Sequence, residues 1–153
     1  MTPLSQLLDD RAVDLSLPKG RKPAIIAHLA GLAAATGAVT DRDALERELL
    51  QREEEISTAT GAGIAIPHKL SPHVNRRILG FARCAGGVAF DAPDRKPVEL
   101  FFLLLAPEAA VTDHLRILSR LARYLHDGEF KQRLLSAENV DALRSAFLSK
   151  ETE

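Results

Sequence analysis

Residues 100–106 read LFFLLLA, an unbroken apolar run that lies between Pro97 and Pro107. The two prolines limit the run to strand length, well short of the roughly 20 apolar residues that cross a bilayer. A strand with apolar side chains on both faces must be covered on both faces. The run therefore predicts a central strand at 97–106, in a sheet with helices on both sides.

Helical patterns lie before and after this strand in the sequence, and further extended patterns precede it. Helices are expected at about 20–37, 41–52, 112–125 and 130–135, and a last one capped by Ser136. Further strands are expected at 56–60, 63–66 and 77–85. Two helices, then strands, then three helices predict an α/β fold: a single mixed β-sheet of about four or five strands sandwiched between helices.

The composition is that of an ordinary globular chain. With 153 residues, 46% apolar and 27% charged, it predicts one domain, residues 1–153. A formal net charge of -1 gives no field to attract nucleic acid or an anionic membrane. Cys84 is the only cysteine, so no disulfide forms within the chain, and the N-terminus lacks a signal-peptide core. These features predict a cytoplasmic protein with no membrane insertion.

The segment GAGIAIPH, residues 61–68, has the strongest local signal for a functional site. Pro67 cannot donate to a sheet ladder, so it ends the strand or confines it to an edge. His68 is therefore expected at a strand end, where α/β sheets carry their sites. Gly61 and Gly63 permit a tight turn and close approach of a ligand. From the residues alone, His68 is either a surface-loop residue or an imidazole nucleophile near an anion.

A second histidine, His114, lies in the first turn of the helix expected at 112–125. The helix dipole attracts an anion there and disfavours imidazolium, although an exposed histidine is the simpler alternative. The chain has no HExxH or CxxC motif, so no metal site is predicted. It also has no GxSxG, Walker A or GxGxxG motif, which argues against a serine triad or a nucleotide site.

Residues 49–68, LLQREEEISTATGAGIAIPH, resemble the signature around the phosphorylated histidine in the enzyme IIA domains of the bacterial phosphoenolpyruvate-dependent phosphotransferase system. The class is the fructose–mannitol–nitrogen type. Residues 88–125 are similar to the family's strand, acidic turn, central strand and histidine-bearing helix. The resemblance covers about residues 4–148 and implies the enzyme IIA mannitol/fructose-type fold.

The resemblance also implies roles for particular residues. His68 is the expected phosphoryl acceptor, through Nε2 as tele-phosphohistidine, and His114 is expected to stabilise the phosphate. Arg52, Glu53 and Thr58 match supporting positions. Whether Arg52 pairs with the phosphate or holds Glu53 stays open. Such a phosphoryl carrier needs no metal and no cofactor.

Three positions depart from the family's usual pattern. Ala62 stands where members often have asparagine, and Lys69 and Ile56 stand where glycine is frequent. None of these changes touches the nucleophile. They are expected to affect the choice of partner protein more than the chemistry.

The expected donor is a histidine-phosphorylated carrier protein of the HPr/NPr type. Two roles then remain for the phosphorylated chain: a nitrogen-regulatory protein that acts on target proteins, or a fructose/mannitol-type transport component that passes the group to a IIB domain. The free-standing length and the segments 7–34 and 90–109 favour the regulatory branch. A binding module that is never phosphorylated is disfavoured by the two histidines.

Overall fold

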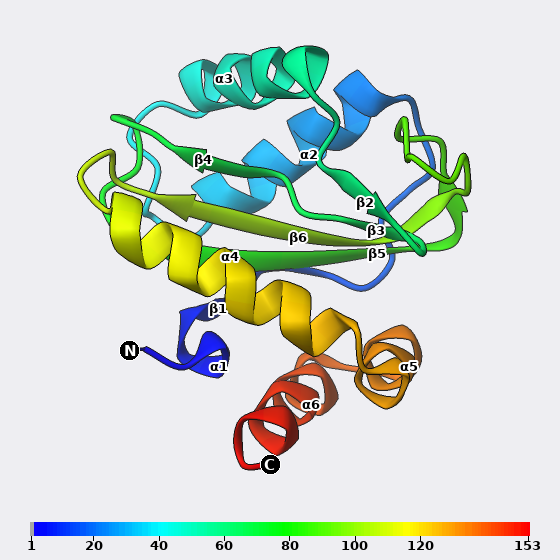
Figure 1. Ribbon diagram of the computed structural model, residues 1–153. Helices are drawn as coiled ribbons and strands as arrows, with labels where there is room; N and C mark the ends of the chain where they lie inside the picture. Colours follow the sequence, from blue (N-terminus) through cyan, green and yellow to red (C-terminus); the bar gives the residue numbers. More distant parts are fainter. Residues whose placement is uncertain (1) are drawn as a thin grey trace.

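The computed structural model describes residues 2–153 and has one mixed sheet between two layers of helices (Figure 1). In chain order the elements are α1 (Leu4–Leu7), β1 (Leu8–Asp14), α2 (Lys22–Ala34), α3 (Arg42–Glu55), β2 (Ala59–Gly61), β3 (Ile64–Ala65), β4 (His68–Leu70), β5 (Ile78–Val88), β6 (Val98–Ala106), α4 (Val111–Leu125), α5 (Gly128–Ser136) and α6 (Val140–Glu151). Among these residues no helix is both long and apolar enough to span a membrane.

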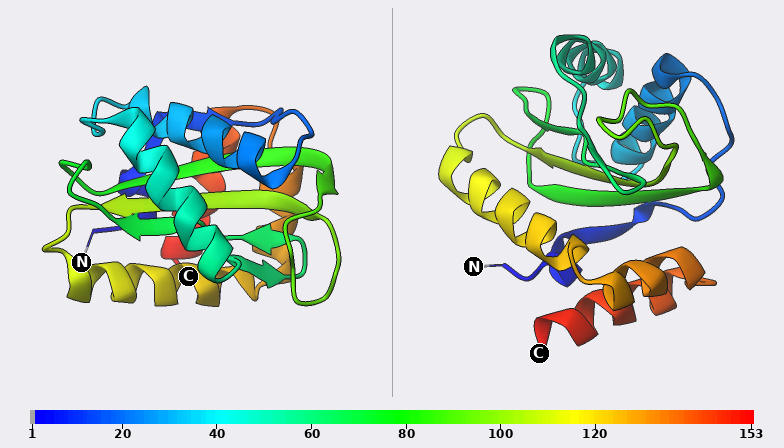
Figure 2. Two further views of the ribbon diagram at one scale, coloured as in Figure 1. Left: turned by 90° about the horizontal axis from the view of Figure 1, so that it is seen from above. Right: turned by 45° about the vertical axis from the view of Figure 1, so that its right-hand side comes forward.

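The central strand divides two apolar cores, as its apolar run predicted. Phe101, Leu103 and Leu105 pack into the core under α2 and α3. Leu100, Phe102 and Leu104 alternate with them and pack into the core under α4, α5 and α6. The right-hand view in Figure 2 shows these two helical layers on opposite sides of the sheet. The sandwich predicted from the sequence is confirmed.

The sheet has six strands, slightly more than the four or five expected. Two strands lie outside the expected ranges: the short β4, which pairs with β6, and the edge strand β1, which pairs in parallel with β5. Its sequence, LDDRAVD, buries only Leu8 and Ala12, and three consecutive polar residues at 9–11 hide the alternation typical of a strand. The last helix was also misplaced at its start: Ser136 ends α5, and Asn139 caps α6 through a bond from the backbone N–H of Ala142.

Strands β3 and β4 lie one after the other along the same side of β6. Both run parallel to β6 with the same offset, because Ile64 lies opposite Leu100 and His68 lies opposite Leu104. Pro67 causes the break, since it has no N–H, but its carbonyl still accepts from the N–H of Leu104 at 3.0 Å. His68 therefore follows the end of β3, as expected, and also begins the short strand β4.

Two further features stabilise the sheet near β3 and β4. The β2–β3 turn consists of Ala62 and Gly63, both with positive φ (56° and 78°), which is the backbone of a type I′ hairpin. On the other side of the sheet, Arg83 from β5 donates to the carbonyls of Leu134 and Ala137 at the end of α5. The sheet and the α4–α6 layer are thus joined by hydrogen bonds as well as by apolar packing.

Candidate functional site

His68 has one ring nitrogen held by the backbone. Its Nδ1 lies 2.7 Å from the carbonyl oxygen of Ile66, two residues earlier. A carbonyl only accepts, so in the neutral ring Nδ1 carries the proton and donates it. Nε2 then keeps its lone pair. The geometry supplies the acceptor that a nucleophilic Nε2 requires.

His114 lies opposite His68, on the first turns of α4. The two ring centroids are 5.7 Å apart and the ring planes are tilted by 47°. His114 is only 4% exposed, and neither of its ring nitrogens has a hydrogen-bond partner among residues 2–153. Two histidines that are distant in sequence therefore share one site, between the start of β4 and the first turns of α4.

The environment keeps His114 neutral. Burial is the main cause that lowers the pKa of His114 from 6.5 to about 4, and the charges of His68 and Arg77 lower it further. At neutral pH the ring therefore carries one N–H and one lone pair. A neutral imidazole at this position can donate one hydrogen bond to an anion on His68.

Glu53 and Thr58 support His68 from the opposite helical layer. The buried carboxylate of Glu53 accepts from the Thr58 backbone N–H at 3.2 Å and from the Thr58 hydroxyl. The Thr58 carbonyl in turn accepts from the N–H of Ile66 at 3.0 Å. Because the Ile66 carbonyl holds His68 Nδ1, this chain of hydrogen bonds fixes the backbone that orients the imidazole.

A lysine holds this carboxylate. Lys22 Nζ, from the start of α2, lies 2.9 Å from Glu53 Oε2 and 4.6 Å from the centre of the Phe90 ring. Lys22, rather than Arg52, is therefore the partner of Glu53. Arg52 is half-buried on α3, and its guanidinium makes no hydrogen bond or ion pair with the rest of residues 2–153. Sequence reasoning missed Lys22 because nothing local links it to Glu53.

Exposed apolar residues surround the two histidines. Val111 and Leu115, on either side of His114 along α4, are 51% and 60% exposed. Leu115 continues into a shallow surface groove of about 410 Å³ along α4, which it shares with Arg116, Ser119, Arg120 and Arg123. Such a rim suits brief contact with another protein better than enclosure of a small substrate.

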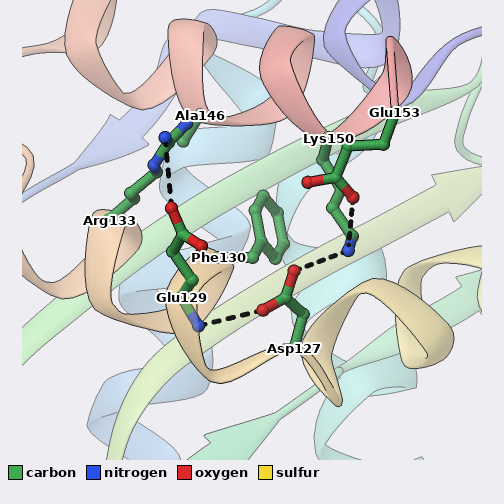
Figure 3. Close-up of a pocket in the computed structure, with 7 residues that line it drawn as sticks. All are labelled: Asp127, Glu129, Phe130, Arg133, Ala146, Lys150 and Glu153. Carbon is green, nitrogen blue, oxygen red and sulfur yellow. Dashed lines mark hydrogen bonds and ion pairs between the residues drawn. The ribbon is translucent and has the colours of Figure 1, made fainter.

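A charged cluster between α5 and α6 lies apart from this site (Figure 3). Lys150 bridges Asp127 at 2.6 Å and Glu153 at 2.9 Å, while Arg133 pairs with Glu129 at 3.4 Å. The cavity that these residues line measures only about 10 Å³. Its charges satisfy one another, and the cluster fastens α5 to α6. Among residues 2–153, no three His, Cys, Asp or Glu side chains gather as metal ligands.

Comparisons with known proteins agree with this arrangement. Residues 6–150 match the family model described as "Phosphoenolpyruvate-dependent sugar phosphotransferase system, EIIA 2". The fold is thus that of a phosphotransferase-system enzyme IIA, and the chain belongs to the type-2 family of these proteins. The family resemblance seen in the sequence is confirmed.

Relatives with two different names resemble the chain. It is 41% identical to a PTS system fructose-specific EIIA component of Haloferax volcanii, over 94% of each chain. It is 37% identical to a nitrogen regulatory protein of Bradyrhizobium diazoefficiens, over 94% of this chain and 93% of the relative. The crystal structure of nitrogen regulatory protein IIA-Ntr from Neisseria meningitidis matches with a TM-score of 0.87 and 30% identity, over 94% of this chain and 97% of that one.

Proposed function

We propose that this chain is a phosphoryl carrier that accepts a phosphoryl group on Nε2 of His68 from a histidine-phosphorylated donor of the HPr/NPr type. One observation supports this most directly: the bond from Nδ1 to the Ile66 carbonyl leaves Nε2 as the nucleophilic nitrogen. His114, with two unpartnered ring nitrogens next to His68, is suited to donate to the phosphate oxygens.

No proton needs to leave or enter either imidazole, that of the donor histidine or that of His68, during the transfer step. The Nε2 lone pair of His68 attacks phosphorus in line, and a new N–P bond forms. The donor's N–P bond breaks, and its electron pair returns to the donor nitrogen, which leaves as neutral imidazole. His68 becomes a phosphoimidazolium whose positive charge is stabilised by the bond from Nδ1–H to the Ile66 carbonyl. Glu53 and Thr58 act as positioning residues through the backbone of Ile66.

For the biological role, we favour a nitrogen-regulatory protein whose phosphorylation state controls binding to a target protein. The likeness to nitrogen regulatory proteins in sequence and in structure supports this role. Phosphorylation adds about two negative charges beside the exposed Val111 and Leu115, which weakens an apolar contact there. The alternative is a transport component that passes the group to a IIB domain. The fructose-specific relative supports it, and because that relative is also matched over 94% of its length, chain length does not separate the roles.

The phosphoryl acceptor is tested by incubating the protein with phosphoenolpyruvate, enzyme I and the carrier protein. The wild type should gain one acid-labile phosphate, and His68→Ala should gain none while it unfolds at a similar temperature. His73→Ala is a matched control, because it removes a half-buried histidine from the loop that follows β4. This variant should be phosphorylated on His68 as fast as the wild type. Full phosphorylation of His68→Ala would exclude His68 as the acceptor.

The two roles are separated by a second pair of experiments. A regulator should capture its target with His68→Ala better than with His68→Asp, a weak mimic of the phosphorylated state. A transport component should be needed for growth on one particular sugar. Loss of growth on a single phosphotransferase sugar, restored only by a phosphorylatable chain, would replace the regulatory role with the transport role.

A further inference from the structure

Three buried side-chain nitrogens lack a hydrogen-bond partner within residues 2–153: Nδ1 and Nε2 of His114, and Nε of Arg77. Buried polar atoms are nearly always paired in folded proteins, so unpaired ones mark a strained or ligand-binding position. The three atoms belong to one neighbourhood. The charge of Arg77 acts on His114, and its guanidinium lies 3.9 Å from the carboxylate of Asp113, the residue before His114.

The register of the sheet places Arg77 on the face of His68. Leu104 of β6 lies opposite His68 on β4 and opposite Leu79 on β5, so these three side chains share one face. Arg77 lies two positions before Leu79, and the alternation of the extended chain gives it the same face. Leu104 and Leu79 belong to the core under α4. Arg77 and His68 therefore approach the first turns of α4 from two strands that flank β6.

We propose that Arg77 is a phosphate-binding residue of this site and supplies the positive charge that faces the phosphoryl group on His68. This inference rests on the phosphoryl-carrier function proposed above. A guanidinium offers a planar fork of donors that matches phosphate oxygens, and it stays charged at any physiological pH. The unpartnered Nε gives Arg77 a donor that no protein group uses. Its only ion pair within residues 2–153 joins it to the 58% exposed Asp113 and is long, at 3.9 Å.

The two residues then have separate tasks. His114 is neutral and contributes a hydrogen bond, while Arg77 contributes the fixed charge. The arginine implied by the family resemblance, Arg52, comes from α3, which packs against the opposite face of the sheet. Arg77 was overlooked in the sequence because an arginine that precedes a strand is usually a solvated flanking charge. Its position near His68 becomes clear only from the sheet, in which β4 and β5 both pair with β6.

The test uses phosphoramidate as the phosphoryl donor, because this small molecule needs no protein docking surface. In this reaction the P–N bond of phosphoramidate breaks, ammonia leaves, and the group forms a bond with Nε2 of His68. The rate of phosphohistidine formation is followed by ³¹P NMR in the wild type, Arg77→Lys and Arg77→Gln. Arg133→Gln is the control, since it removes an equal charge from a 48% exposed residue of α5 that lies in the charged cluster apart from this site.

Arg77→Gln should react roughly 30-fold or more slowly, Arg77→Lys should be intermediate, and Arg133→Gln should stay within about twofold of the wild type. A normal rate for Arg77→Gln would overturn the inference while leaving the carrier function intact. Absence of phosphorylation in the wild type would overturn both.

A measurement on the wild type covers the case in which Arg77→Gln fails to fold. The Nε–H resonance of Arg77, assigned by its loss in Arg77→Lys, should shift and sharpen when His68 is phosphorylated. An Nε–H resonance that is the same before and after phosphorylation would refute a contact with phosphate.

Discussion

Replacing His114 with glutamine should make the protein less sensitive to acid. The imidazole is 4% exposed, and burial, assisted by the charges of His68 and Arg77, lowers its pKa from 6.5 to about 4. In the unfolded chain the pKa returns to the ordinary value. Between pH 6.5 and pH 4 the unfolded state therefore binds more protons than the folded state, so the free energy of unfolding falls as the pH falls.

The size of this effect follows from the two pKa values. With 6.5 for the unfolded chain and about 4 for the folded protein, proton linkage removes about 2 kcal/mol of stability at pH 5 and about 3 kcal/mol at pH 4, relative to pH 8. Glutamine has a similar length and keeps an N–H donor, but it does not titrate. The variant should lack this loss and keep only the pH dependence of the other groups.

The assay is urea unfolding of both proteins at a series of pH values from 8 to 4. The informative quantity is the difference between the two free energies of unfolding, because the contributions of all other titrating groups cancel in it. This difference should be constant above pH 7 and should change by about 3 kcal/mol in favour of His114→Gln at pH 4. Its value at pH 8 measures the packing effect of the substitution alone.

A flat difference across the whole range would refute the reasoning. It would mean that His114 is solvated or has a hydrogen-bond partner in solution, and that its imidazole is not held neutral by burial. Long-range ¹H–¹⁵N spectra of the ring give an independent check. A titration midpoint of His114 near 6.5 would lead to the same conclusion.

Three other substitutions test separate parts of the structure. His114→Ala should slow phosphoryl transfer to His68 roughly 30- to 1000-fold, because it removes a hydrogen-bond donor to the developing charge. Peptide mass spectrometry should still find the phosphate on His68. An unchanged rate would show that His114 has no part in transfer. Ala62→Asn should raise the free energy of unfolding in urea by about 0.5–1 kcal/mol, because asparagine tolerates the left-handed backbone of this exposed turn better than alanine; lower stability would contradict the type I′ geometry. Lys22→Met should lower that free energy by about 3–5 kcal/mol, because the buried Glu53 carboxylate loses its cation. Adding Glu53→Gln should recover much of the loss, and a Lys22→Met protein as stable as the wild type would argue against the pair.

The sequence predicted the parts of the fold that are written in local patterns. The central strand follows from apolar residues at six consecutive positions, 100–105, which no exposed or one-sided strand would carry. The helix at 111–125 follows from its regular apolar stripe. Strand β1 was missed because its pairing with β5 outweighs a polar, aspartate-rich sequence of low strand propensity. The strand propensity of residues 8–14 cannot indicate their partner strand, β5, which lies about seventy residues further along the chain.

The site divides in the same way. The sequence singled out His68 and His114 because motifs mark them, whereas Lys22 and the proposed phosphate ligand Arg77 depend on tertiary contacts that no motif records. The strand before Pro67 ends as expected, but nothing in the sequence indicated that a second short strand, β4, begins directly after it.

Phosphorylation of His68 should raise the pKa of His114. Without phosphate, burial, together with electrostatic interactions with His68 and Arg77, disfavours imidazolium at this position. A phosphoryl dianion on the ring opposite, whose centroid is 5.7 Å away, would reverse the sign of the local field. Because coupling between two sites is reciprocal, a protonated His114 must then also favour the phosphorylated state of His68.

This coupling can be measured between pH 6 and pH 8, where phosphohistidine persists long enough for ¹H–¹⁵N spectra of the rings. The unphosphorylated protein should show a neutral His114 across this range. The phosphorylated protein should show ring nitrogens that move towards imidazolium as the pH falls, with a midpoint well above that of the free protein. Equal spectra for the two states would place His114 out of reach of the phosphate, and its burial would then serve the packing of α4 alone.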